Sequence, residues 1–139
     1  MREFSFAEGV RLLISAGQTP VLRPTGSSMV PAIYPGDRVL LRHAGEIRVG
    51  DIVLVEGPRL HRVIRVDARN ETIVTKGDAL AGPDGEVSQA SVAAVVEQVE
   101  PSWGSRARFL LARRFPGWWR CARVVLGPAW RRLRGERGR

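Results

Sequence analysis

The sequence contains almost no cysteine. Cys121 is the one cysteine among 139 residues. A single cysteine cannot form an intramolecular disulfide, so the fold does not depend on an oxidising compartment. A metal site is equally unsupported, and we expect the protein to work without a metal or another cofactor.

Long apolar runs are also missing. Glu3, Glu8 and Arg11 are distributed through the N-terminal stretch and interrupt the apolar run that a secretory signal needs. A transmembrane helix needs about 20 mostly apolar residues. The longest uncharged run in the apolar tail is Val124 to Trp130, and a Gly-Pro pair interrupts it. We therefore expect a cytoplasmic protein, or one held peripherally at the inner face of a membrane.

The first hundred residues carry almost no net charge, whereas the residues after them carry a large positive excess. Residues 1–100 hold 11 basic and 13 acidic residues, a net −2. Residues 101–139 hold 11 Arg and one acid, Glu136, a net +10 that accounts for the overall charge of +8. With 44% hydrophobic and 26% charged residues, the composition is that of a globular protein with one ordinary core.

The N-terminal segment, residues 1–20, predicts an amphipathic helix over about residues 6–16. Ser5 followed by Glu8 forms a capping-box pattern. Phe6, Val10, Leu13 and Ile14 recur at helical spacing before Gly17 and Pro20 stop the element. The apolar face of this helix either packs on the domain, which we favour, or lies on a membrane or a partner.

Residues 21–100 predict a mainly β domain. Short runs rich in Val, Ile and Leu alternate with Gly, Pro and Asp turns, as in all-β proteins. The expected strands are Arg38–Arg42, Ile52–Glu56, Leu60–Asp67, Thr72–Lys76 and Ser91–Val99. A turn at Asn70-Glu71 joins the third and fourth strands into a hairpin.

Residues 101–139 form a tail rich in Arg and Trp. Two Gly/Pro pairs divide it into helical pieces of about residues 103–115, 118–126 and 129–134. Arginines mixed with tryptophans fit peripheral contact with an anionic membrane through residues 103–134. The alternatives are helices packed on the β domain and, least favoured, contact with nucleic acid.

Ser28 is the candidate nucleophile. A serine hydroxyl needs a base within hydrogen-bond reach and backbone N–H groups that hold the oxyanion. The run Gly26-Ser27-Ser28-Met29-Val30-Pro31 offers such a turn, because Gly26 leaves backbone donors uncovered and Met29 anchors the turn against the sheet. The oxyanion donors are the N–H of Ser28 and that of Ser27.

His61 is the candidate base. It stands near the start of a strand-like run, where alternation puts His61, Val63 and Arg65 on one face. Either Asp78 or Asp84 could orient the imidazole, because a carboxylate on one ring nitrogen favours the imidazolium formed during proton transfer. The sequence does not choose between these two aspartates, which are also ordinary turn residues.

Together these residues resemble the signal-peptidase family of serine peptidases, within the S26/S24 superfamily. The resemblance runs from Pro24 to about Val99. Its four boxes, in chain order, are Gly26–Pro31 with Pro35-Gly36-Asp37, then Gly50–Val53, Leu60–Ile64, and Lys76-Gly77-Asp78 through Asp84.

The resemblance implies the Ser-His type of the archaeal and endoplasmic-reticulum enzymes, because His61 stands where the usual bacterial type has Lys. LexA-like repressors share the fold but use Ser-Lys. Lys76 is the chain's one lysine and falls in the closing box, so a Ser28-Lys76 dyad is a minor alternative. The residue two before the nucleophile, often Ser in the family, is Gly26 here.

The expected function is cleavage of a signal or leader-type peptide from a peptide or protein precursor. By resemblance, Ser28 attacks the scissile carbonyl, His61 moves the proton, and Asp78 or Asp84 orients His61. The alternative is a non-catalytic domain of the same fold that binds a peptide or partner and carries a membrane-binding tail.

Overall fold

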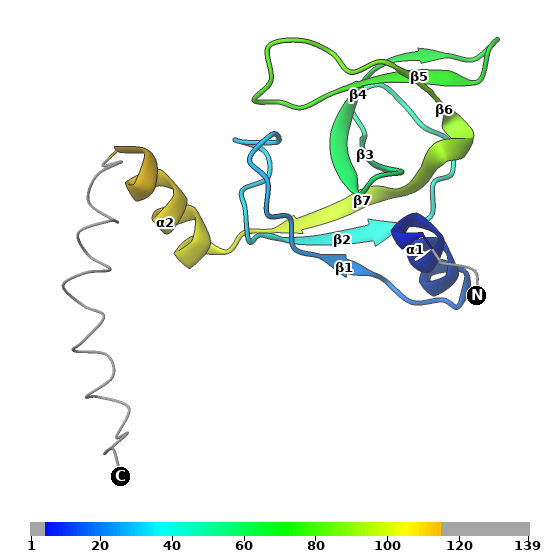
Figure 1. Ribbon diagram of the computed structural model, residues 1–139. Coiled ribbons are helices and arrows are strands. Elements are labelled where there is room, and N and C mark those ends of the chain that lie inside the picture. The colour runs from blue at the N-terminus through cyan, green and yellow to red at the C-terminus, as the bar shows by residue number, and fades with distance from the viewer. Residues whose placement is uncertain (1–4, 115–139) are drawn as a thin grey trace. The chain divides into compact units, whose positions relative to one another are not determined.

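The computed structural model describes residues 5–114, and residues 1–4 and 115–139 are not described (Figure 1). A helix begins the described part, seven strands follow, and a second helix ends it. The elements are α1 (Phe6–Ser15), β1 (Val21–Leu22), β2 (Arg38–Arg42), β3 (Ile52–Val55), β4 (Arg59–Asp67), β5 (Thr72–Lys76), β6 (Glu86–Ser88), a short 3₁₀ turn (Gln89–Ser91), β7 (Val92–Glu100) and α2 (Trp103–Arg114).

The seven strands form one antiparallel sheet in the order β1-β2-β7-β3-β4-β5-β6. The strand β7 pairs with both β2 and β3 and so joins the two halves of the sheet. The predicted mainly β fold of the signal-peptidase and LexA type is therefore confirmed. Figure 1 shows how far β4, β5 and β6 twist away from β1 and β2.

The five strands expected from the sequence are present, and their ends agree within one residue. The hairpin of β4 and β5 is also confirmed. Two edge strands, β1 and β6, were not predicted. They contain two and three residues, which is too short for an alternating pattern to appear in the sequence.

The face assignment along β4 was partly wrong. His61 and Val63 are buried as neighbours on one face, but Arg65 is exposed. The pairing register with β5 shifts after Val63, so that Ile64 is an extra residue on β4. A β-bulge of this kind exchanges the faces of the residues that follow it, and this places Arg65 away from His61.

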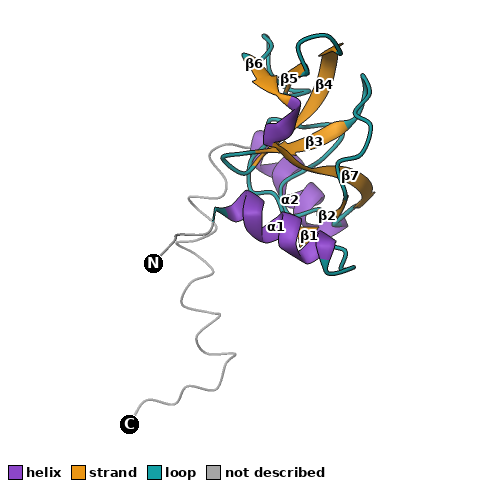
Figure 2. Cartoon of the chain, turned by 90° about the vertical axis from the view of Figure 1, so that its right-hand side faces the viewer, coloured by secondary structure: helices purple, strands orange, loops and turns teal. Residues whose placement is uncertain are grey.

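The helix α1 packs on the sheet. Its N-terminus has the predicted capping box, in which the Ser5 hydroxyl accepts the N–H of Glu8 and the Glu8 carboxylate accepts the N–H of Ser5. Ala7 and Val10 are buried in a cluster with residues of β2 and β7. In Figures 1 and 2 the helix lies beside the half of the sheet formed by β1, β2 and β7. Packing on the domain, the favoured alternative, is therefore observed.

The core lies on both faces of the sheet. Leu54 of β3 belongs to the cluster under α1, together with Met29 and Ile33 of the loop between β1 and β2. Its neighbours Val53 and Val55 belong to a second cluster on the opposite face, with Val63 of β4. Burial on both faces explains why the sequence of β3 is continuously apolar.

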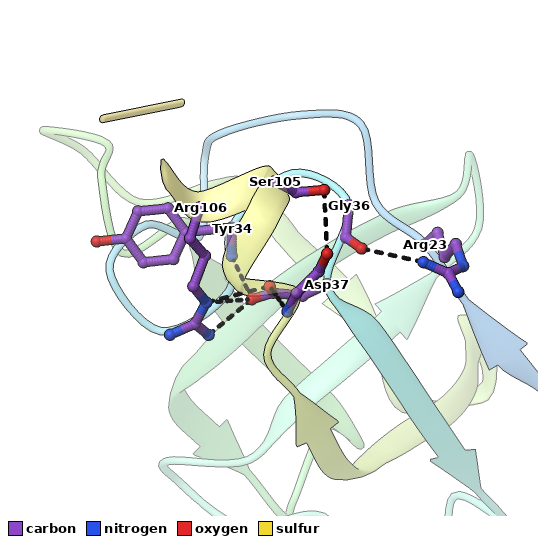
Figure 3. Close-up of polar contacts among 7 residues, drawn as sticks. Arg23, Tyr34, Gly36, Asp37, Ser105 and Arg106 are labelled. Atoms are coloured by element: carbon purple, nitrogen blue, oxygen red, sulfur yellow. Dashed lines mark hydrogen bonds and ion pairs between the residues drawn. The ribbon is translucent and has the colours of Figure 1, made fainter. Parts of the chain in front are cut away.

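A buried carboxylate ties the loop after Ser28 to the chain that follows β7. Asp37 is fully buried and accepts the N–H groups of Tyr34 at 2.9 Å and Ser102 at 2.8 Å. Arg106 adds its Nη2 to Oδ2 at 2.7 Å, and its guanidinium lies 4.8 Å from the centre of the Tyr34 ring (Figure 3). Burial raises the pKa of Asp37, but these hydrogen bonds, led by that of Arg106, outweigh it and hold the pKa below its usual value.

The first predicted tail helix corresponds to α2, and those over residues 118–126 and 129–134 lie outside the described residues. The division at residues 20 and 100 stays a prediction. Between residues 5 and 114, no helix has the length and apolar character needed to cross a membrane.

We expect Arg106→Ala to lower the free energy of unfolding by about 3–5 kcal/mol, because it leaves a buried carboxylate without its cation. Since the folded pKa of Asp37 is depressed, its contribution is present above the ordinary pKa of about 4 and is lost as the pH falls through the folded pKa. The difference between the two proteins in urea unfolding should therefore shrink in acid.

The matched control is Arg38→Ala. Arg38 bonds Glu100 at 2.5 Å, but both side chains are more than a third exposed, so its loss should cost under about 1 kcal/mol. Equal losses in the two variants would show that the buried carboxylate does not depend on Arg106.

Candidate active site

Ser28 begins a tight turn in the loop between β1 and β2. The N–H of Val30 donates to the carbonyl of Ser27 at 3.2 Å, and that of Ile33 to the carbonyl of Met29 at 2.9 Å. Met29 and Ile33 are buried under the turn, while Ser28 is half-buried. The apolar side chains thus fix the turn and leave the serine hydroxyl at the surface of the domain.

The hydroxyl of Ser28 meets the imidazole of His61. Ser28 Oγ lies 3.2 Å from Nε2 of His61, which is 3% exposed on β4 opposite Val53 of β3. The serine is on a loop and the histidine is on the sheet, 33 residues later in the chain. The fold thus brings together the predicted nucleophile and the predicted base at hydrogen-bond distance.

Asp84 is the carboxylate that contacts His61. Its Oδ2 lies 2.5 Å from Nδ1 of His61 and also accepts the Thr75 hydroxyl at 2.7 Å. Burial raises the pKa of Asp84, but the hydrogen bonds from His61 and Thr75 outweigh it and hold that pKa below its usual value. An ionised carboxylate only accepts hydrogen bonds, so Nδ1 of His61 is the donor to Asp84. In the neutral imidazole this tautomer leaves the lone pair on Nε2, the nitrogen that faces Ser28.

Asp78 has a different partner. It forms a two-pronged ion pair with Arg62, with Nε to Oδ1 at 2.8 Å and Nη2 to Oδ2 at 2.7 Å. Arg62 also donates Nη1 to the carbonyl of Gly50 at 2.9 Å. The hydrogen bond with Asp78 raises the pKa of the Arg62 guanidinium. Of the two aspartates left open by the sequence, Asp84 is therefore the one placed beside the imidazole.

The segment that contains Asp78 also supports the serine. The N–H of Ala79 donates to the carbonyl of Ser28 at 2.8 Å, so the loop after β5 is bonded directly to the nucleophile turn. A Cβ added to Gly77 would lie 2.8 Å from that same carbonyl. Figure 1 shows the loop between β1 and β2 rising toward the loop between β5 and β6. Position 77 therefore requires a glycine, because a larger residue would overlap the Ser28 carbonyl.

Lys76 projects from the opposite face of the β4–β5 hairpin to Thr75. It pairs with Arg62 across β4 and β5, whereas Thr75, which reaches Asp84, pairs with Val63. Successive residues of a strand point to opposite faces. This geometry favours His61 over Lys76 as the partner of Ser28. The second histidine, His43, is exposed on the loop after β2.

The proposed oxyanion region is open. Gly26 and Ser27 are exposed, and no residue between 5 and 114 accepts a hydrogen bond from the N–H of Ser27 or Ser28. Both N–H groups are therefore without an acceptor in this part of the chain, and their role as oxyanion donors stays a prediction. Met29, expected to anchor the turn, is 4% exposed and packs in the cluster under α1.

A cleft of about 510 Å³ opens beside Ser28. It runs between the chain that follows β1 and the turn between β3 and β4, and Phe6 of α1 also lines it. Its walls are mostly apolar, with side chains of Leu22, Pro24, Met29, Ile33 and Leu60. A cleft of this size next to a serine can hold several residues of an extended peptide.

The family model described as Peptidase S24-like matches residues 2–78, more than half of the chain. The chain belongs to this family of peptidases. The S24-like match includes Ser28, His61 and Asp78, whereas Asp84 lies beyond its end. The predicted membership of the S24/S26 group is thereby confirmed.

A relative within this group is the signal peptidase complex catalytic subunit sec11 of Dictyostelium discoideum. It is 33% identical to this S24-like chain over 76 residues, which cover 48% of the chain and 42% of the relative. The chain therefore spans less than half the length of this curated relative. No solved structure matches the chain.

The sequence did not reveal two supporting side chains, Thr75 and Arg62. Thr75 is buried within the apolar run of β5, and a polar residue in such a run was the available signal. Arg62 follows His61 directly, but its pairing with Asp78 depends on the β4–β5 register, which no local pattern encodes.

We expect Gly77→Ala to lower the free energy of unfolding by about 1–3 kcal/mol, because the added methyl group overlaps the Ser28 carbonyl and the Leu80 side chain. Amide chemical shifts of residues 27–30 should move in the same variant. The matched control is Gly85→Ala, where nothing lies within 4 Å of the added Cβ. Similar effects on the Ser28 turn in both variants would contradict the close approach.

Proposed function

We propose that this chain is a serine endopeptidase that cleaves a signal or leader-type peptide. The observation that carries the proposal is the line of contacts from Ser28 Oγ through both nitrogens of His61 to the Asp84 carboxylate, at 3.2 Å and 2.5 Å. A family of peptidases and a signal-peptidase relative support the choice of a peptide bond as the target.

In the proposed reaction, Ser28 Oγ attacks the scissile carbonyl carbon while Nε2 of His61 takes the hydroxyl proton. The same nitrogen then gives the proton to the leaving amine, and water repeats the sequence to release the acyl group from the serine. Asp84 keeps the proton of the neutral imidazole on Nδ1 and stabilises the imidazolium that forms. The N–H groups of Ser28 and Ser27 hold the negative oxygen.

Asp78 acts indirectly in this mechanism. It forms an ion pair with Arg62, which follows His61 on β4. The N–H of its neighbour Ala79 donates to the carbonyl of Ser28. Its effect on the reaction is therefore through the distance between Ser28 and His61, with no direct contact to the reacting atoms.

The membrane context is a further part of the proposal. Leu110 and Leu111 of α2 are each about half exposed, and Arg113 and Arg114 stand in the last turn of the same helix. Exposed leucines beside arginines suit an anionic membrane surface. We expect α2 to hold the peptidase at such a surface.

The catalytic assignment predicts that Ser28→Ala and His61→Ala each lower kcat by about 10⁴-fold or more on leader peptides that the wild-type chain cleaves. Cleavage is followed by mass spectrometry of the products. Asp84→Asn should cost about 10²- to 10⁴-fold, because it removes the charge beside His61, and Asp78→Asn clearly less.

The comparison of the two aspartates is the internal control, since both variants remove one carboxylate charge. Cleavage that survives both Ser28→Ala and His61→Ala would eliminate the assignment. Tight peptide binding with no cleavage by any variant would favour the non-catalytic alternative.

The membrane assignment predicts that the double change Leu110→Ser and Leu111→Ser reduces co-sedimentation of the full chain with phosphatidylglycerol vesicles. Vesicles of phosphatidylcholine should bind both proteins weakly, because they lack the anionic charge. Val49→Ser is the control, since Val49 is 64% exposed on the loop before β3. Unchanged sedimentation of the double variant would remove α2 as an anchor.

A further inference from the structure

The cleft beside Ser28 has a charge pattern that the proposed chemistry does not use. Two of the side chains that line it, Arg23 and Arg59, are cationic, and no Asp or Glu within the described part of the chain lines it. The other walls are apolar or neutral. A substrate in this cleft therefore contacts a lining that combines two positive groups with apolar side chains.

Arg23 is held only weakly by the protein. It is exposed, and its Nη1 lies 3.4 Å from the carbonyl of Gly36, a long contact. Figure 3 shows Arg23 on the Gly36 carbonyl, while the nearby Asp37 carboxylate is taken by Arg106. Among residues 5–114, no carboxylate lies within ion-pair distance of Arg23. Most of its five N–H donors remain available to a ligand.

Arg59 is similarly placed at the other wall. It begins β4, two residues before His61, and its side chain is 46% exposed. Its Nη1 is 3.9 Å from Oδ1 of Asp84, the limit of an ion pair, while Oδ2 of Asp84 is already bonded to His61 and Thr75. Arg59 thus lines the cleft next to the His61–Asp84 pair, and no hydrogen bond from its guanidinium to residues 5–114 occupies its N–H donors.

We infer that the cleft selects peptides that carry an aspartate or glutamate among the residues bound in it, with Arg23 and Arg59 as the groups that bind the carboxylate. The inference rests on the proposed peptidase function and names a substrate class for it. A guanidinium presents a planar fork of donors that matches a carboxylate, and a cleft wall strengthens such a pair relative to open solvent. The apolar walls accept the neighbouring small or apolar residues of the peptide.

The test uses pools of short peptides in which one position at a time is Glu, Gln or Lys, and the full-length chain. At low ionic strength, kcat/KM should be about 10-fold higher for Glu than for Gln at one or more positions, and lowest for Lys. The preference should fall toward unity in about 1 M salt, because salt screens an exposed pair. Equal rates for Glu, Gln and Lys at every position would overturn the inference.

Variants locate the preference. Arg23→Gln and Arg59→Gln should each lower the ratio of the Glu rate to the Gln rate, and Arg23→Glu should shift the preference toward Lys. Arg59 lies beside Asp84, so its substitution can also change the chemical step. Such a change affects the Glu and Gln peptides equally, and the ratio of their rates therefore reports the selection alone. Arg42→Gln is the matched control, since Arg42 is an exposed arginine on β2 outside the cleft.

A binding measurement separates this inference from the proposed function. Fluorescence anisotropy with the Ser28→Ala chain should give the same preference for Glu, dependent on both arginines. Preferential binding without cleavage by the wild type would contradict the peptidase function alone, and cleavage without preference would contradict the acidic selection alone. If no peptide is bound or cleaved, or if the two arginines instead govern sedimentation with anionic vesicles, the inference is overturned.

Discussion

The candidate active site depends on one buried imidazole with a partner on each nitrogen. His61 is 3% exposed, with Asp84 at 2.5 Å from Nδ1 and Ser28 at 3.2 Å from Nε2. A buried polar ring needs such partners, because an unpaired polar group inside a protein costs about 1–3 kcal/mol. In the mechanism that we propose, this pairing sets the direction of proton transfer, from the Ser28 hydroxyl to Nε2 of His61.

Much of the surrounding structure holds these three groups together. Burial under α1 anchors the Ser28 turn through Met29, and the Ala79 N–H bonds the carbonyl of Ser28 to the loop after β5. The Arg62–Asp78 pair connects that loop to β4, the strand of His61. At the other end of the Ser28 loop, the buried Asp37 carboxylate is neutralised by Arg106. Contacts thus hold the Ser28 loop both at the Ser28 turn and at its far end.

The sequence predicted the elements well where its pattern was local. Strand Thr72–Lys76 could be found because a short β-branched run lies between turn residues, and the α1 capping box because Ser5 and Glu8 have the required spacing. The bulge after Val63 could not be predicted, since it reflects the fit between two strands. The alternation of residues in the sequence therefore assigned Arg65 to the wrong face of β4.

The candidate residues could be proposed from the sequence, but their geometry only in part. Ser28 and His61 were proposed from their motifs, and the fold places them 3.2 Å apart. The choice between Asp78 and Asp84 depends on which carboxylate the fold turns toward the ring. That choice needs the β4–β5 register and the Thr75 contact, which join residues distant in the chain. The Arg106 partner of Asp37 lies 69 residues away and had no local signal.

The most direct measurement of this arrangement is the tautomer of His61 in the free protein. Long-range proton–nitrogen NMR spectra at mildly alkaline pH distinguish a protonated Nδ1 from a protonated Nε2, and the exposed His43 provides an internal reference. We predict that the neutral His61 ring carries its proton on Nδ1 and that Asp84→Asn removes this preference. A His61 ring protonated on Nε2 in the wild-type protein would contradict it.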